Sequence, residues 1–176
     1  MKKLMKFLAY CLFFIIALIY FAPKISAYYF LESQIKPFGV IVSGEDLRDN
    51  GFSLEIENAD ISFKAIESAK IKEIHVKIYG VYNGVSFEDI SLSSTVASFI
   101  PLHVTSASVT HTIIDPLNVH AFIEGEFGEA EATYDILANG VKVTLKPSDI
   151  MLKKYKSTLR SLSKNGNGEY VYEKTF

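Results

Sequence analysis

The stretch that decides the fold is residues 117–145, LNVHAFIEGEFGEAEATYDILANGVKVTL, in which apolar and polar side chains alternate. A period of two places the apolar side chains of a strand on one face and the polar side chains on the other. Residues 125–128 and the pair Asn139-Gly140 interrupt this alternation. Asn-Gly between two alternating runs is the strongest short-range signal for a hairpin. The stretch therefore predicts three consecutive antiparallel strands that share one apolar face.

The same alternation occurs in other parts of the chain after residue 40. A short run at 90–92 resumes the pattern shifted by one residue, which predicts a bulge or bend near Asp89. The other alternating runs are 52–57, 74–79 and 85–87, and further turn signals are Asp49-Asn50-Gly51, Asn83-Gly84 and Asp115-Pro116.

These patterns predict a mainly β protein built as a curled antiparallel meander of about seven to nine strands, either a half-pipe or a sandwich. A parallel α/β sheet is disfavoured because no long helical pattern separates the strands. The apolar face has to be covered by the sheet itself or to hold something apolar.

An uncharged apolar segment precedes the predicted sheet. Residues 7–22 read FLAYCLFFIIALIYFA, with three lysines before them and Pro23-Lys24 after them. A helix over 7–23 would span roughly 25 Å, and lysines at both ends can reach the headgroups of a bilayer whose core is about 30 Å thick. The basic start predicts that residues 1–6 are cytoplasmic and that 37–176 form an extracytoplasmic domain.

The alternative for this segment is a cleaved signal peptide, because small residues at 25–27 resemble a cleavage site. A retained anchor is favoured, since the apolar run is longer than a usual signal-peptide core and bulky Tyr20 and Phe21 lie close to the cleavage site. Both alternatives export the domain.

Two further helices are predicted. Residues 24–36 form a short juxtamembrane helix that Pro37 and Gly39 end. A C-terminal amphipathic helix follows Pro147, and residues 169–176 form a last short strand. The apolar stripe of that C-terminal helix is Leu152, Tyr155, Leu159 and Leu162, and its basic face includes Lys153, Lys154, Lys156 and Arg160. The basic face either contacts an anionic membrane or a partner or stays in water while the stripe packs on the sheet, and the second is favoured.

Composition and motifs argue against catalysis and against nucleic-acid binding. The formal net charge is −2, so no basic excess points to nucleic acid. Cys11 is the single cysteine, which excludes an intrachain disulfide and a multi-cysteine zinc site. The four histidines form neither HxH nor HExxH, and nucleophile-elbow, P-loop and dinucleotide motifs do not occur. We therefore expect no enzyme activity, no catalytic residue, no metal site and no cofactor.

The apolar sheet face supplies the candidate binding residues. Apolar side chains there form a closed core by default, and an open groove would contact lipid or a partner protein. The candidate residues on this face are Phe52, Leu54, Ile56, Ile74, Val76, Ile78, Val119, Ile123 and Val143.

The order of parts resembles bacterial envelope proteins of the AsmA and type II secretion protein N families. The resemblance is carried by residues 21–47, FAPKISAYYFLESQIKPFGVIVSGEDL, and by repeated segments such as NADISFKAI (58–66) and AKIKEIHVKIYG (69–80). It implies one apolar helix in a bacterial inner membrane and a curled periplasmic sheet, with no catalytic residues.

Two functions follow from this resemblance. The first is a non-catalytic scaffold or accessory component of a secretion or pilus-like system, with envelope proteins as partners. The second is a lipid-binding or lipid-transfer module whose apolar sheet face contacts acyl chains. The partner, the ligand and the oligomeric state stay open at this point.

Overall fold

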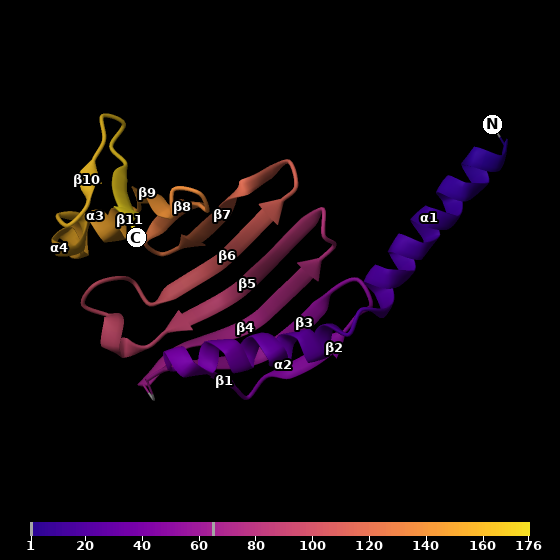
Figure 1. The fold of residues 1–176 in the computed structure, drawn as a ribbon. Coiled ribbons are helices and arrows are strands. Elements are labelled where there is room, and N and C mark those ends of the chain that lie inside the picture. Colours follow the sequence, from indigo (N-terminus) through magenta and orange to yellow (C-terminus); the bar gives the residue numbers. More distant parts are fainter. Residues whose placement is uncertain (1, 65) are drawn as a thin grey trace.

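The computed structural model describes residues 2–64 and 66–176, and its main feature is one curved antiparallel sheet (Figure 1). The strand order is β1-β3-β4-β5-β6-β7-β8-β9-β11-β10, and β2 pairs with β3. The predicted curled antiparallel meander is confirmed, the described residues form eleven strands where seven to nine were expected, and the sheet is not closed. The strands are β1 (Val40–Ser43), β2 (Asp46–Asp49), β3 (Leu54–Phe63), β4 (Ile66–Ile78), β5 (Tyr82–Leu92), β6 (His103–Thr112), β7 (Asp115–Gly125), β8 (Gly128–Asp135), β9 (Gly140–Pro147), β10 (Ser163–Lys164) and β11 (Tyr170–Thr175).

The pairing register aligns apolar side chains from strand to strand, because alternate residues of paired strands share a face. We call the face that carries these rows the inner face and the opposite, polar face the outer face. The first row is Leu54, Val76, Val85, Val109, Ala121, Ala132, Val143 and Tyr172. The second row is Ile56, Ile74, Phe87, Ala107, Ile123, Ala130, Leu145 and Tyr170.

The bend predicted near Asp89 crosses several strands at one level. Asn58 in β3 and Asp89 in β5 have positive φ angles of 58° and 55°. The register of β3 with β4 and of β4 with β5 is the same on both sides of this level, so no residue is inserted there. Against β7, in contrast, Thr105 of β6 is an extra residue, which makes a bulge. In β3 to β6 the alternation of apolar and polar residues shifts by one residue at this level, whereas in β7 it does not. The bulge at Thr105 accommodates this difference between β6 and β7.

Two predicted turns are wrong in position. The β4–β5 turn contains Gly80, whose φ is 78°. Asn83 lies inside β5, and its Oδ1 accepts a hydrogen bond from the Gly80 N–H at 3.1 Å. The β6–β7 turn contains Ile113 and Ile114, and Asp115 already begins β7. Asn83 therefore supports its turn from the neighbouring strand, whereas the Asp115 carboxylate accepts hydrogen bonds from Asn118 and His120 within β7.

Helix α2 (Lys24–Ile35) covers the inner face over the first strands (Figure 1). Its Ile25 and Tyr28 pack on a core cluster, and a short 3₁₀ helix (Lys36–Phe38) ends it at Gly39, whose φ is 84°. The observed bounds lie within the 24–36 range expected from the sequence. The buried members of this cluster are Leu54, Ile56, Ala59, Ile71 and Ile74.

A second cover lies at the C-terminal end of the strand order. The C-terminal helical segment forms two short helices, α3 (Asp149–Lys154) and α4 (Lys156–Leu159), because the backbone leaves helical geometry at Tyr155 (φ −118°, ψ 36°). Met151 and Leu159 are buried, whereas Leu152 of the predicted stripe is largely exposed. Ile100, in the loop after a 3₁₀ helix (Ser94–Val96), also packs against this second core cluster. The buried members of this cluster are Val104, Phe127, Ala130, Leu145, Met151 and Leu159.

Helix α1 (Lys2–Phe21) extends away from the sheet, and none of its residues is buried (Figure 1). It is long and apolar enough to cross a membrane, as judged by its length and composition. The backbone then turns at Pro23 into α2.

The end of α1 is held by Lys24. This side chain is 7% exposed, and its Nζ donates hydrogen bonds to the carbonyl oxygens of Ile19 at 3.1 Å and of Tyr20 and Ala22 at 3.3 Å. The same Nζ lies 3.4 Å from Oδ1 of Asp49 in β2. A cation at a helix C-terminus satisfies carbonyls that have no partner inside the helix. Lys24 therefore joins α1 to the sheet.

An aromatic contact reinforces this junction. The ring of Tyr20 meets the ring of Phe52 edge to face with centroids 5.3 Å apart. The Tyr20 ring also covers Gly51, where an added Cβ would lie 2.3 Å from a ring carbon. Gly51 has a φ of 80°, so both its backbone conformation and this close approach favour glycine.

Candidate functional site: an apolar trough

The strongest candidate site is the part of the inner face that lies between the two helical covers. We call it the trough and define it by Val85, Val109, Ala121, Ala132 and Val143, five neighbours in the first row. These residues lie on β5 to β9, and the buried members of the two core clusters do not include them. With strands about 4.8 Å apart, the trough is about 19 Å long across the strands.

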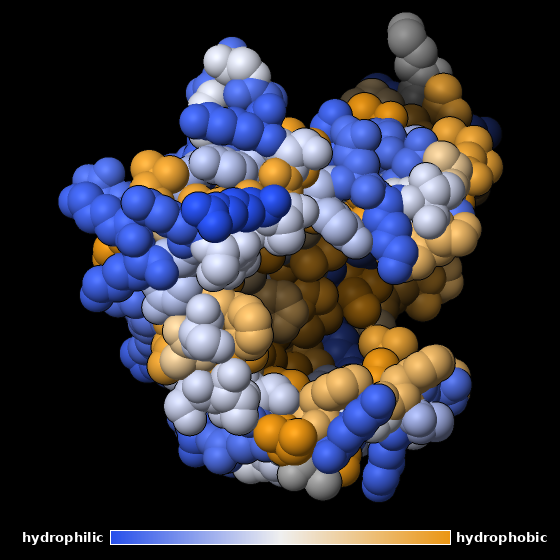
Figure 2. Space-filling view, turned by 90° about the vertical axis from the view of Figure 1, so that its left-hand side faces the viewer, coloured by the Kyte–Doolittle hydropathy of each residue, from blue (hydrophilic) through white to orange (hydrophobic). Residues whose placement is uncertain are grey.

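The trough is accessible from outside. Val109, the second residue of the row, is 38% exposed, and the other four residues are half-buried. At one end of the trough, Val85 lies beside α2. Figure 2 shows the molecule hollowed between its upper and lower parts, with apolar residues lining the hollow. An apolar strip that stays accessible on a folded chain is a candidate binding surface.

An apolar pocket of about 110 Å³ lies beside the trough, where α2 meets the sheet. Tyr28 and Leu31 of α2 face Val76, Ile78 and Val85 across it. The Tyr28 hydroxyl donates a hydrogen bond to Oε1 of Glu45 at 3.2 Å. Burial and the adjacent Glu45 carboxylate raise the pKa of Tyr28 above its ordinary value, so the hydroxyl stays protonated and remains a donor.

The structure distributes the predicted site residues over several places. Leu54, Ile56 and Ile74 are closed core beneath α2 and are not available to a ligand. Phe52 lies in the turn before β3 and contacts Tyr20, so its predicted place on the strand is wrong. The remaining five are partly accessible on or beside the inner face: Val76 and Ile78 line the pocket at α2, and Val119, Ile123 and Val143 lie on β7 and β9.

Four residues of the trough were not among the predicted site residues: Val85, Val109, Ala121 and Ala132. Val85 and both alanines belong to alternating runs, so the period of two gives their face. Which of these positions stays uncovered depends on the register and on where the helices pack, and short-range patterns do not report either.

The basic residues of the C-terminal helices all point into solvent. Lys153, Lys154, Lys156 and Arg160 are exposed, and none has a salt-bridge partner among the described residues. The apolar residues Met151 and Leu159 pack inward. The lysines in water agree with the interpretation favoured from the sequence, but Met151 takes the buried position expected for Leu152.

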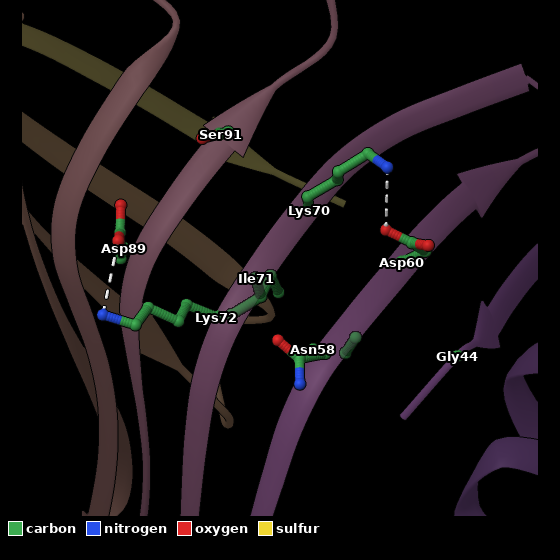
Figure 3. Close-up of a pocket in the computed structure, with 9 residues that line it drawn as sticks. Gly44, Asn58, Asp60, Lys70, Ile71, Lys72, Asp89 and Ser91 are labelled. Atoms are coloured by element: carbon green, nitrogen blue, oxygen red, sulfur yellow. Dashed lines mark ion pairs between the residues drawn. The ribbon is translucent and has the colours of Figure 1, made fainter. Parts of the chain in front are cut away.

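A larger but polar hollow of about 450 Å³ lies on β3, β4 and β5 at the level of the bend. Figure 3 shows its charged side chains in pairs, with Lys70 Nζ 3.5 Å from Asp60 Oδ1 and Lys72 Nζ 3.9 Å from Asp89 Oδ2. The Asp60 carboxylate raises the pKa of Lys70. Because each cation shown already has a carboxylate partner, these side chains form exposed ion pairs, which contribute little to stability.

One cluster on the outer face has donor spacing suited to a cation. Ligand atoms of Glu55, Glu73 and His75 lie within 4.8 Å of one another. His75 Nε2 is 2.9 Å from Glu73 Oε1, while Glu55 Oε2 accepts hydrogen bonds from Asn50 at 3.1 Å and Arg48 at 3.5 Å. Arg48 already supplies a positive charge to this cluster, so we assign no metal to it.

Comparisons with family models, with curated proteins and with solved structures find no match to this chain. The resemblance to AsmA-like and type II secretion protein N-like proteins therefore stays a prediction.

Proposed function

We propose that this chain is a single-pass membrane protein whose external domain binds lipid acyl chains in the trough. The observation that carries the proposal is the partly exposed apolar row from Val85 to Val143, which lies outside the buried clusters of the folded domain. Its five side chains are aliphatic and carry no hydrogen-bonding group, which suits a hydrocarbon chain and offers nothing to a polar substrate.

The membrane assignment is supported by α1 and its junction. Lysines at 2, 3 and 6 favour a cytoplasmic N-terminus, and the sheet then lies on the outer side, which we place in the periplasm next to a bacterial inner membrane. Cleavage after Ala27 would cut inside α2 and remove both Lys24 and Ile25 from their contacts. The junction thus supports a retained anchor over a cleaved signal peptide.

The proposal is tested with the full chain purified in mild detergent and titrated with a fluorescent fatty acid. Ala132→Trp places a large ring in the trough, whereas Glu131→Trp adds the same ring to the exposed outer face one residue away on β8. We expect saturable binding to the parent chain and to Glu131→Trp, and loss of the saturable component in Ala132→Trp. Equal binding by all three chains would contradict the proposal.

A scaffold for envelope proteins is the second candidate, and one observation favours it. β10 pairs only with Tyr170 and Val171 of β11. Within the described chain, the edge of β11 that faces away from β9 therefore has no strand neighbour from Tyr172 to Thr175. Such an edge can accept a strand from another protein. Crosslinking from Tyr172 to a protein in cells, with no lipid in the trough, would support the scaffold instead.

A further inference from the structure

One edge of the sheet gathers four hairpin turns and the chain terminus. Because the strands form a meander, alternate turns lie at the same edge, and the turn that contacts α1 belongs to this set. We call this edge the anchor rim. It comprises residues 50–53, 79–81, 113–114 and 136–139 together with Phe176, whose N–H donates a hydrogen bond to the Asn139 carbonyl at 2.9 Å.

The anchor rim is unusually apolar. None of the residues in its four turns is charged, although turns at a water-exposed edge are ordinarily polar. Ile114 is 93% exposed and Leu137 is 76% exposed, so the tips of two hairpins present large aliphatic side chains to the surroundings. The other exposed apolar residues of the rim are Phe52, Val81, Ile113, Ile136 and Phe176.

Acidic groups next to these turns accept hydrogen bonds from nearby donors. Asp135 Oδ1 accepts the Ala138 N–H at 2.8 Å, and Asp49 Oδ1 accepts the Gly51 N–H at 2.8 Å. Asp115 accepts hydrogen bonds from Asn118 and His120, each at 2.8 Å. Carboxylates that already have donors lose less on approaching a headgroup layer than carboxylates solvated only by water.

The place where α1 leaves the domain distinguishes the anchor rim from the opposite edge of the sheet as a membrane-facing surface. The opposite edge also has exposed apolar side chains, such as Phe99 and Phe38, but α1 leaves the domain at the anchor rim. Lys24, Asp49 and the Tyr20–Phe52 contact fix the end of α1 to this edge. In the view of Figure 1, α1 extends away from the edge where the turns after β4 and β6 lie.

We infer that the anchor rim rests against the same bilayer that α1 crosses, with Ile114 and Leu137 inserted at the boundary between headgroups and acyl chains. The inference rests on the proposed membrane crossing of α1 and is independent of lipid binding in the trough. Aliphatic tips beside tyrosines such as Tyr79 and Tyr82 suit that boundary, where aromatic rings are enriched. The contact would hold the trough close to the lipid surface.

The test uses the full chain with Cys11→Ser, so that a single introduced cysteine can carry an environment-sensitive fluorophore. Labels go on Ile114→Cys and Leu137→Cys at the anchor rim, on Phe99→Cys at the opposite rim and on Phe13→Cys within α1. Each labelled protein is reconstituted into phosphatidylcholine and phosphatidylglycerol vesicles with or without nitroxide-labelled lipids. We expect nitroxide lipids to quench the labels at positions 114, 137 and 13 and to leave the label at 99 unquenched.

The outcomes separate the inference from the function it rests on. Quenching at 13 without quenching at 114 and 137 would overturn the rim contact and keep the membrane anchor. Quenching at 114 and 137 without quenching at 13 would overturn the membrane crossing of α1, and with it the inference as stated, and would leave a rim that binds the bilayer by itself. Equal quenching at 99 and 114 would also overturn the inference, because it would show no preference for the anchor rim.

Discussion

At the residue scale, the junction between α1 and the sheet depends on a few side chains whose roles the sequence shows only in part. Lys24 follows the apolar segment and has the position of a headgroup lysine, yet it is buried and caps α1 while pairing with Asp49. The sequence indicated Gly51 as a turn residue, and the structure adds that Tyr20 packs directly on it. Long-range contacts of this kind have no local pattern, so they could not be predicted.

Two glycines provide a matched test of that junction. Gly51 and Gly80 both lie in turns with φ near 80°, so alanine at either position adds left-handed strain of about 1–2 kcal/mol. Only at Gly51 would the new methyl group also meet the Tyr20 ring, since Gly80 has open space around it. We expect Gly51→Ala to increase hydrogen exchange of residues 19–24 and Gly80→Ala to leave that segment unchanged. Equal exchange in both variants would show that Tyr20 does not pack there.

The pair Asp115–His120 makes a pH-dependent prediction. The hydrogen bond from His120 is the main cause that lowers the pKa of Asp115, the one from Asn118 adds to it, and the charge of His111 has the smallest effect. A lowered carboxyl pKa stabilises the fold above the ordinary value of about 3.9, and this stabilisation disappears as pH falls through the lowered pKa.

We therefore expect His120→Ala to raise the pKa of Asp115 toward its ordinary value and His111→Ala to raise it less. Carbon-13 NMR titration of the Asp115 carboxyl measures both shifts. A larger shift in His111→Ala than in His120→Ala would contradict the hydrogen-bonding pattern of this turn.

At the scale of elements, strands were predicted better than their connections. The period of two placed β7, β8 and β9 correctly, because one solvated face and one apolar face leave a strong local signal. Asn83 and Asp115 misled the turn assignment, since both lie inside strands: Asn83 accepts a hydrogen bond from Gly80 in the turn, and Asp115 pairs with Asn118 and His120 within β7. The C-terminal helix was expected to bury Leu152, but a break at Tyr155 rotates the segment so that Met151 packs inward.

The C-terminal cover can be tested by adjacent truncations on α3. Met151 is 2% exposed within the second core cluster, so Met151→Ala should lower the free energy of unfolding by about 2–5 kcal/mol. Leu152 is 39% exposed, and Leu152→Ala should change the free energy of unfolding by about 0.5 kcal/mol. Urea titration of the full chain, followed by circular dichroism, measures both values. A larger loss of unfolding free energy in Leu152→Ala than in Met151→Ala would show that α3 packs on the sheet through Leu152 and would contradict the structure.

At the scale of the whole molecule, the curved sheet has two covers and an open middle. The sequence predicted the apolar face, because that property is local and periodic. It could not show that α2 closes Leu54, Ile56 and Ile74 while Val109 stays accessible, because coverage depends on tertiary packing. Under the two proposals made above, the anchor and the rim hold the domain close to a bilayer, and the trough offers an apolar strip to acyl chains.

The most direct test of lipid binding is photocrosslinking in cells from a benzoylphenylalanine placed at Val109 in the trough. Ser108 is the matched control, because it precedes Val109 on β6 and its side chain lies on the outer face. Mass spectrometry of the purified chain should find lipid adducts from position 109 and none from position 108. Absence of lipid adducts at 109, or equal adducts at both positions, would contradict the proposal that the trough holds acyl chains.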